Sequence, residues 1–304
     1  MNAGDVSIRF VIGSRKIAEM RRPLQTVAFG LSQLVAGTAA CLPELEDGRE
    51  GYRVHSVPRA MLPAIVADHP GFVMGGLHVY RRFYIDMAGT YEGYLGRFSS
   101  RARSTLNRKR RKIQDLGGGT LDVREYRTPD ELDQFLVDAM PLSRKTYQAR
   151  LLDAGLPEDE AFVDEMRALA GADRLRAYLL FLNDAPVSYL FLPVIDNVVT
   201  YAFLGYDPDR ANLSAGTVLQ MEALRRLFAE ERYTYFDFTE GEGAHKQLFG
   251  TDFVDACSFF LLKRTLSSRL LLGALAVFDR SVAAGKTLAQ RNGALARMRR
   301  FLRA

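Results

Sequence analysis

Two tight turns between apolar segments constrain the fold of this 304-residue chain more than any other feature. The dipeptides Asn183-Asp184 and Asp196-Asn197 separate three apolar segments, 175–182, 186–194 and 198–206. Connections this short join neighbouring antiparallel strands, so the sequence predicts two successive β-hairpins. A regular series of parallel strands is excluded for this part of the chain, because parallel strands need much longer connections.

Helices and further strands are predicted on both sides of the hairpins. Apolar residues at helical spacing predict a helix over 91–116, which Gly117, Gly118 and Gly119 end because glycine lowers helix stability. A strand and two helices then precede the hairpins, and a helix, a strand, a short helix and a last strand follow them, over 214–229, 233–238, 243–249 and 256–262. This order predicts an α/β (α+β) fold in which helices flank a mixed, mostly antiparallel sheet.

We interpret the chain as three parts. Residues 1–116 form an N-terminal part that ends in a basic helix, residues 117–263 form the main domain, and residues 264–304 form basic amphipathic helices. Those last helices suit either packing on the domain or contact with a membrane interface. No apolar run approaches the roughly 18–20 residues that a membrane-spanning helix needs.

Basic residues are concentrated in two segments. Residues 97–112 contain eight basic residues and no acid, and residues 263–304 contain ten basic residues and one acid, whereas the whole chain has a net charge of +5. Such patches attract phosphate groups, anionic lipid surfaces or nucleic acid. For segment 97–112 we expect contact with substrate phosphates or anionic lipid, and an ordinary exposed helix face is the alternative.

The composition excludes several protein classes. Apolar residues make up 48% of the chain, charged residues 25%, and there are two cysteines, so disordered, collagen-like and disulfide-scaffold proteins do not fit. The first residues lack the apolar core and cleavage site of a secretory signal. We therefore expect a cytoplasmic protein, with a peripheral position at the inner face of the membrane as a variant. No metal site is expected, since His55, His69 and His78 have no partners at ligand spacing.

The start of the helix predicted over 214–229 has features of a phosphate site. Ser214, Ala215 and Gly216 are small and would let a phosphate approach the backbone. A helix N-terminus offers unpaired N–H donors and a partial positive charge to such an anion. The alternative is that Ser214 is only an N-cap for a helix that packs on the core.

Residues 233–250 carry a longer pattern. A strand ends in Asp237, an acidic and glycine-rich turn follows, and Lys246 precedes an aromatic-glycine pair, Phe249-Gly250. Together with the small-residue helix start, this pattern resembles the CelD/Fem-like (FemAB-type) branch of the GNAT acyltransferase superfamily. The arginine-rich helix before the domain resembles the same branch at Phe98, Ser99, Arg103, Leu106 and Arg108, and the resemblance covers residues 79–262.

The chain departs from the family pattern at two positions. Arg210 and Ala215 fit the phosphate loop, but Leu213 stands where the first glycine is expected. His245 stands where relatives have a tyrosine. Since related Fem-type enzymes pair two such folds, we interpret residues 1–78 as a candidate degenerate first copy.

The resemblance implies an acyl-CoA N-acyltransferase fold. Acyl-CoA is then the expected co-substrate, with acyl carrier protein or aminoacyl-tRNA as donors in relatives of the same fold. The residues expected to hold the donor are Arg210, Asn212, Ser214, Ala215, Gly216 and Thr217.

The catalytic candidates follow the strand that ends in Asp237. Lys246 matches the family lysine and would stabilise an oxyanion or hold an acceptor phosphate. His245 is the leading acid/base candidate, because the imidazole pKa of about 6.5 suits proton transfer near neutral pH. Asp237, within an aromatic strand, is either a base or orienter for these two or a structural partner of an arginine or backbone group. Glu240 is a further candidate in the turn.

Substrate contacts are expected from several elements. Each lies in one of three predicted regions: the strand beside the thioester, the acceptor pocket or the basic helix. They are Tyr201, Arg144, Lys145, Tyr147, Glu242, Arg103 and Arg108.

The sequence therefore predicts an N-acyltransferase that moves an acyl group from a thioester to a primary amine. Acceptors that fit the basic amphipathic tail include an amphiphilic or lipid-linked amine such as a sphingoid base, as in a ceramide synthase, or an amino sugar. An acidic acyl carrier protein and an anionic membrane are candidate partners. Two alternatives are a non-catalytic thioester- or membrane-binding module and an aminoacyl-tRNA-dependent Fem-type transferase. Nucleic-acid binding ranks low, since no RNA or DNA motif accompanies the charge.

Overall fold

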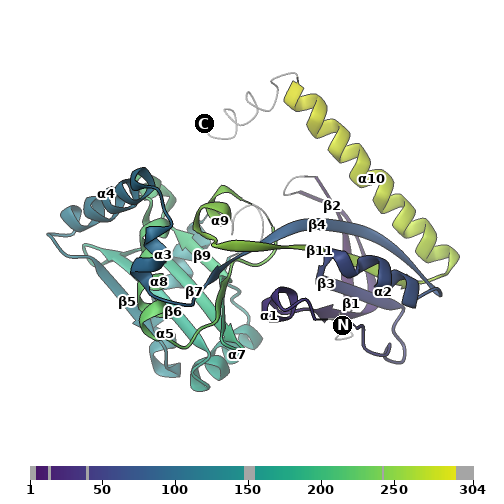
Figure 1. The fold of residues 1–304 in the computed structure, drawn as a ribbon, viewed down its shortest axis with the longest axis horizontal. Coiled ribbons are helices and arrows are strands. Elements are labelled where there is room, and N and C mark those ends of the chain that lie inside the picture. The colour runs from purple at the N-terminus through teal and green to yellow at the C-terminus, as the bar shows by residue number, and fades with distance from the viewer. Residues whose placement is uncertain (1–4, 13–14, 39–40, 147–154, 242, 292–304) are drawn as a thin grey trace. The chain divides into compact units, whose positions relative to one another are not determined.

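The computed structural model describes residues 5–12, 15–38, 41–146, 155–241 and 243–291. The chain divides into two compact units (Figure 1). The first unit consists of residues 1–81 and 254–304, and the second unit of residues 82–253. Both divisions fall inside strands, in β4 (Phe72–Asp86) and in β11 (Asp252–Lys263).

The sheet of the second unit contains the predicted hairpins. Its strand order is the end of β4, then β10 (Tyr235–Asp237), β8 (Val198–Thr200), β7 (Ala185–Ile195), β6 (Leu175–Leu182) and β5 (Asp122–Tyr126). β9 (Phe203–Tyr206) pairs with β7. All these pairs are antiparallel except β8 with β10, so the prediction of a mixed, mostly antiparallel sheet is confirmed.

The two turns adopt the conformation that their residues favour. Asn183 and Asp184 have φ values of 51° and 58°, and Asp196 and Asn197 have 50° and 60°. Positive φ at both central residues is the requirement of a two-residue hairpin turn whose twist matches the strands. The strand predicted over 198–206 is split, because Tyr201 and Ala202 separate β8 from β9.

Helices pack on both faces of this sheet. Along β6, Tyr178, Leu180 and Leu182 enter one core, and the intervening Ala177, Leu179 and Phe181 enter the other. The first core contains side chains of α3 (Tyr91–Gly96), α4 (Ser100–Leu116), α8 (Ala215–Ala229) and α9 (Ala244–Phe249). The second core contains side chains of α5 (Pro129–Lys145) and α7 (Glu160–Gly171).

The basic helix α4 belongs to the second unit. Its apolar side chains Leu106 and Ile113 are buried in the core that contains α8, and Lys112 Nζ donates to the carbonyl oxygen of Asn212 at 3.3 Å. The division at Arg82 thus differs from the boundary expected at residue 116. The glycine triplet ends α4, but the helix still packs on the domain that follows it.

The first unit contains the strands β1 (Asp5–Ile12), β2 (Arg15–Ala28) and β3 (Gly51–Pro58) with most of β4 and β11. Its described helical segments are α1 (Leu31–Val35), η1 (Arg59–Met61), α2 (Leu62–Asp68) and α10 (Leu266–Arg291). Leu271, Leu272 and Leu275 of α10 pack against Ile8 and Phe260 of this unit. The described part of the predicted C-terminal helices is thus one helix that packs on its own unit, and residues 292–304 lie outside the described residues.

Two expectations from the sequence concern membrane spans and the origin of the first unit. None of the helices in the described ranges is long and apolar enough to cross a membrane. The interpretation of residues 1–78 as a degenerate copy of the second unit stays a prediction.

Candidate active site

A gap opens in the sheet where β8 gives way to β9. β8 pairs with β10 in parallel, and the Tyr201 N–H then donates to the carbonyl oxygen of Asp237 at 2.9 Å. β9 forms its ladder with β7 on the other side. The backbone beyond Tyr201 therefore leaves β10, and a ligand can lie between the two separated strands.

Helix α8 begins directly after this gap. The chain passes from β9 through η2 (Pro208–Leu213) to Ser214, which has φ 55° and ψ 39° and makes no capping hydrogen bond with its side chain. The alternative of Ser214 as a simple side-chain N-cap is therefore not what the structure shows. The first N–H groups of any helix lack an intrahelical acceptor, so those of α8 stay available.

A cavity of about 450 Å³ lies at this helix end, and we call it cavity A. It is lined by α8, by the β8–β9 segment and by α9. The lining residues are Tyr201, Leu204, Tyr206, Ala211, Ser214, Gly216, Thr217, Gly243, His245 and Lys246. The gap in the sheet, the uncapped helix and the candidate catalytic pair thus meet in one place.

A second cavity, cavity B, has a volume of about 470 Å³ and lies between α4 and α9. It shares Thr217 and His245 with cavity A. The other lining residues are Ser99, Arg101, Ala102, Thr105, Leu106, Lys109, Ala244, Leu248 and Phe249. His245 therefore borders two cavities, one at the α8 N-terminus and one beside the basic helix.

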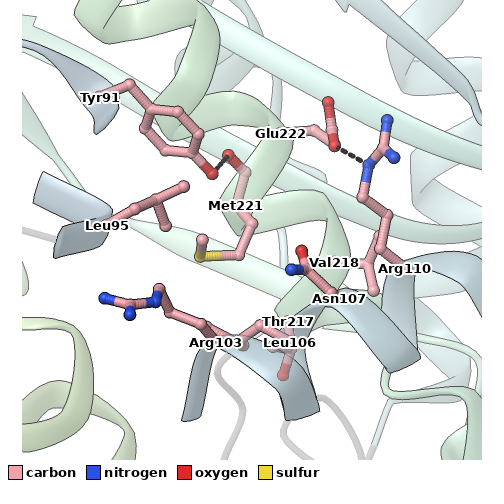
Figure 2. Close-up of a pocket in the computed structure, with 10 residues that line it drawn as sticks. All are labelled: Tyr91, Leu95, Arg103, Leu106, Asn107, Arg110, Thr217, Val218, Met221 and Glu222. Atoms are coloured by element: carbon pink, nitrogen blue, oxygen red, sulfur yellow. Dashed lines mark hydrogen bonds and ion pairs between the residues drawn. The ribbon is translucent and has the colours of Figure 1, made fainter. Parts of the chain in front are cut away.

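A third cavity, drawn in Figure 2, lies between α3, α4 and α8 and has a volume of only about 70 Å³. Arg110 Nε donates to Glu222 at 2.7 Å on its border, and the Tyr91 hydroxyl donates to the carbonyl oxygen of Met221 at 3.1 Å (Figure 2). A volume of this size suits one or two water molecules. These contacts hold α4 and α3 against α8, and we assign no substrate to this cavity.

His245 is neutral at physiological pH. Its ring lies among Tyr201, Phe238 and Phe249, with the Phe249 ring centroid at 4.7 Å. Burial, with smaller effects of the Lys246 and Lys109 charges, lowers the His245 pKa to about 4. Its Nε2 atom is buried and has no hydrogen-bond partner among the described residues.

Lys246 closes the glycine turn. Its Nζ atom donates to the carbonyl oxygens of Glu240 at 2.5 Å and Thr239 at 3.5 Å. Burial lowers the Lys246 pKa, and the charges of Asp237 and Glu240 partly oppose this shift. An ammonium group has three N–H donors, so one is left for a ligand when only described partners are counted.

Asp237 has a different set of partners from those expected of a base. Arg82 Nη2 and Nε donate to its carboxylate at 2.5 and 3.1 Å, and the Thr239 N–H donates to it at 2.8 Å. This is the arrangement of a structural partner that fixes the turn before Lys246. The sequence did not predict Arg82 as a partner of Asp237, because it lies 155 residues before Asp237, on β4, and belongs to no recognisable motif.

The remaining predicted residues lie in several places. Ser214, Gly216, Thr217 and Tyr201 line cavity A. Ala215 is buried, Arg210 Nε lies 3.7 Å from Asp207, and Asn212 accepts from Lys112 through its carbonyl oxygen. None of these three lines cavity A.

The predicted acceptor residues are spread more widely. Arg144, near the end of α5, pairs with Glu158 at 2.6 Å and does not line cavity A or B, and neither does Lys145. Arg103 donates to the carbonyl oxygens of Gly96 and Phe98. Arg108 is exposed on α4. Tyr147 and Glu242 lie outside the described residues.

A family comparison identifies the domain that holds these cavities. Residues 100–247 match the family described as acetyltransferase (GNAT) domain. These residues form a GNAT domain. All residues that line cavity A lie within it, and of those that line cavity B only Ser99, Leu248 and Phe249 lie just outside it. A search of the curated proteins found no match.

Solved structures share the fold of the GNAT domain and of much of the chain. FemX superposes with a TM-score of 0.54 at 11% identity, over 86% of this chain and 89% of FemX. The C-terminal domain of a putative lysylphosphatidylglycerol synthetase from Agrobacterium fabrum gives a TM-score of 0.50 at 12% identity, over 75% of this chain and 72% of that domain. The Fem-like, GNAT-type transferase fold expected from the sequence is thus confirmed.

The described residues contain no group of three or more His, Cys, Asp or Glu side chains that could hold a metal ion. The polar groups around cavity A include backbone N–H groups, the imidazole of His245, the ammonium group of Lys246 and the hydroxyl-bearing residues Tyr201, Tyr206, Ser214 and Thr217. These are groups that bind phosphate, move a proton and stabilise an oxyanion.

Proposed function

We propose that this protein is an N-acyltransferase that moves an acyl group from an acyl thioester, with acyl-CoA as the donor, to a primary amine. One observation carries the proposal. Cavity A brings together the uncapped N-terminus of α8, a half-buried lysine and His245, whose buried Nε2 has no hydrogen-bond partner among the described residues, beside the gap between β9 and β10. A GNAT domain supplies the matching fold.

The donor is held at the start of α8. The N–H groups of Gly216 and Thr217 bind the donor phosphates, and the partial positive charge of the helix end adds to the attraction. The thioester arm of the donor then lies along the gap beyond Tyr201 and ends near His245.

The transfer needs one proton acceptor and one oxyanion partner. The amine nitrogen attacks the thioester carbonyl carbon, the C–N bond forms, and the C–S bond breaks as the thiolate leaves. Burial lowers the His245 pKa to about 4, so it is a weaker base than the sequence suggested. It takes the proton from the nitrogen as the C–N bond forms and the nitrogen becomes acidic, and it returns the proton to the sulfur. The Lys246 ammonium group stabilises the negative charge that develops on the carbonyl oxygen.

Aminoacyl transfer is the second candidate function. It is favoured by Arg101, Arg108 and Lys109 of α4, whose side chains form no ion pair or hydrogen bond with other described residues. Such a surface attracts a polyanionic donor such as aminoacyl-tRNA. The fold of FemX and of the putative lysylphosphatidylglycerol synthetase domain is consistent with it. Here the donor would be an ester, with the same amine attack.

The testing experiment measures thiol release from acetyl-CoA and long-chain acyl-CoAs with a panel of amines that includes sphingoid bases and amino sugars. We expect release that requires both an acyl-CoA and an amine. His245→Phe and Lys246→Ala should lose this activity, whereas Arg111→Gln, on the exposed face of α4, should retain it. Silence with acyl-CoA but transfer from aminoacyl-tRNA would select the second candidate. Silence with both, together with thermal stabilisation by acyl-CoA, would indicate a non-catalytic binding module.

A further inference from the structure

Cavity B is a candidate subsite with a chemistry of its own. It meets cavity A at Thr217 and His245 and extends from there between α4 and α9. Its volume of about 470 Å³ lies within the usual range for small-molecule sites, roughly 300–1,000 Å³. A substrate whose reacting nitrogen lies at His245 can therefore place the rest of its structure in cavity B.

The wall of cavity B is largely apolar. Leu106 and Phe249 are buried in its floor, while Leu248 keeps 50% of its surface exposed despite being a large aliphatic residue. Ala102 and Ala244 add further apolar surface. Covering such a surface with a hydrocarbon chain is favourable by roughly 25 cal/mol for each Å² removed from water.

The charges around cavity B have one sign. Arg101 and Lys109 line it from α4, and neither side chain pairs with another described residue. No Asp or Glu is among the described residues that line cavity A or cavity B. Lys109 is close enough to His245 to contribute to its lowered pKa. A simple ammonium substrate would meet these cations without compensation, whereas an anionic group would be attracted.

We propose that cavity B binds an acceptor that combines the reacting amine with a phosphate-type anion and a hydrocarbon chain. This inference rests on the proposed function and names its acceptor class, an anionic amphiphile. The amine lies at His245, the anion contacts Arg101 and Lys109, and the chain covers Leu106 and Leu248. The two cations also favour the uncharged form of the amine, which is the form that attacks the thioester.

Four acceptors test the anion and the chain separately. Ethanolamine has neither, phosphoethanolamine has the anion, dodecylamine has the chain, and a lysophosphatidylethanolamine with a 12-carbon chain has both. We expect the highest kcat/KM for the last, with a loss of about tenfold or more when either group is removed. Equal kcat/KM for dodecylamine and the lysophospholipid would overturn the role of the anion.

Variants assign the preference to cavity B. Arg101→Gln and Lys109→Gln should lower kcat/KM for the two phosphate-bearing acceptors several-fold and leave dodecylamine unchanged. Leu248→Ser should act on the two chain-bearing acceptors and spare phosphoethanolamine. Arg111→Gln, a charge loss on the same helix outside cavity B, is the matched control. An equal effect of all three arginine and lysine variants on every acceptor would overturn the assignment.

A binding measurement separates this inference from the proposed function. Dodecyl phosphate carries the anion and the chain but no amine, so its binding by titration calorimetry needs no transfer reaction. We expect wild-type protein to bind it and Lys109→Gln and Leu248→Ser to weaken binding, whereas Arg111→Gln should not. Binding without any acyl transfer would remove the proposed function and leave the subsite. Transfer without this binding would remove the subsite alone.

Discussion

The two ends of helix α8 differ in how completely their polar groups are paired. At the C-terminal end Glu230 accepts from Arg176 Nη2 at 2.7 Å, from Arg127 at 3.0 Å and from the Tyr233 hydroxyl at 2.9 Å. At the N-terminal end Ser214 leaves the helix uncapped, and the nearby His245 Nε2 has no partner among the described residues. The paired groups stabilise the fold, whereas the groups without a described partner are the ones that we assign to ligand binding.

The same contrast is visible in the pKa values. Burial alone would raise the pKa of Glu230, but the hydrogen bonds and charge of Arg176 outweigh it and lower that pKa. For His245 burial acts without an opposing carboxylate, and the neighbouring lysines add to it. At the C-terminal end of α8, the charged Glu230 carboxylate is therefore compensated by arginines. At the N-terminal end, the His245 imidazole is kept neutral beside Lys246 and Lys109.

The largest effect is expected from breaking the paired end. Arg176 is fully buried, and Arg176→Met removes its hydrogen bonds to both Glu230 and Asp173. We expect a loss of about 3–5 kcal/mol in the free energy of unfolding, measured by urea denaturation. Arg167→Met removes an exposed pair with Asp133 and should cost less than about 1 kcal/mol. Equal losses would show that the network does not stabilise α8.

The next largest effect concerns how the free energy of unfolding depends on pH through His245, near the N-terminal end of α8. Because folding lowers the His245 pKa from about 6.5 to about 4, the unfolded state binds more protons between these values. Stability should therefore fall as the pH falls through this window, by up to about 3 kcal/mol. In His245→Phe this contribution should be absent, so its free energy of unfolding should depend less on pH between 6.5 and 4. Parallel pH profiles for the two proteins would contradict the burial of a neutral imidazole.

The third prediction tests the N-terminal end of α8 through the activity of Lys246→Ala. Loss of one oxyanion donor commonly lowers kcat about 100-fold or more. We expect such a loss in kcat for amine acylation, with a small change in Tm because Lys246 bonds only turn carbonyls among its described partners. A wild-type kcat/KM in this variant would remove Lys246 from the mechanism.

The smallest effect is expected at the helix end itself. Ser214→Asp places a carboxylate beside the N–H groups that we assign to the donor phosphates, and Asp tolerates the positive φ of this position. KM for acyl-CoA should rise about tenfold, or about 1.4 kcal/mol, while kcat changes less. Ser214→Asn is the matched uncharged control. An unchanged KM in Ser214→Asp would place the phosphates elsewhere.

Much of the fold could be predicted because its signals are local. The turn pairs Asn183-Asp184 and Asp196-Asn197 tolerate the positive φ of a tight hairpin, so residue type alone indicated antiparallel neighbours. The apolar stripe of α8 and the glycine stop after α4 are likewise properties of short windows. The break between β8 and β9 was missed, because it follows from which strand each half pairs with.

The candidate site could be predicted only in part. His245 and Lys246 are neighbours in a recognisable pattern, and the small residues at 214–217 mark a helix start. Arg82 and Leu248 were not among the predicted residues, and Lys109 was included only as part of the basic segment 97–112, because the positions of these side chains depend on contacts between distant segments. For Asp237 the sequence left two alternatives open, a base or orienter and a structural partner, and its contacts with Arg82 and Thr239 favour the structural partner.

The sequence by itself determined the hairpins, most of the element order after residue 116, the family resemblance and the position of the basic run. Each of these depends on residue types within one turn or one strand, where backbone conformational preferences act. Tertiary structure alone decided that α4 packs on α8, that Ser214 leaves its helix uncapped and that His245 borders two cavities. Those features arise from burial and pairing between segments that are far apart in the chain, and no local preference encodes them.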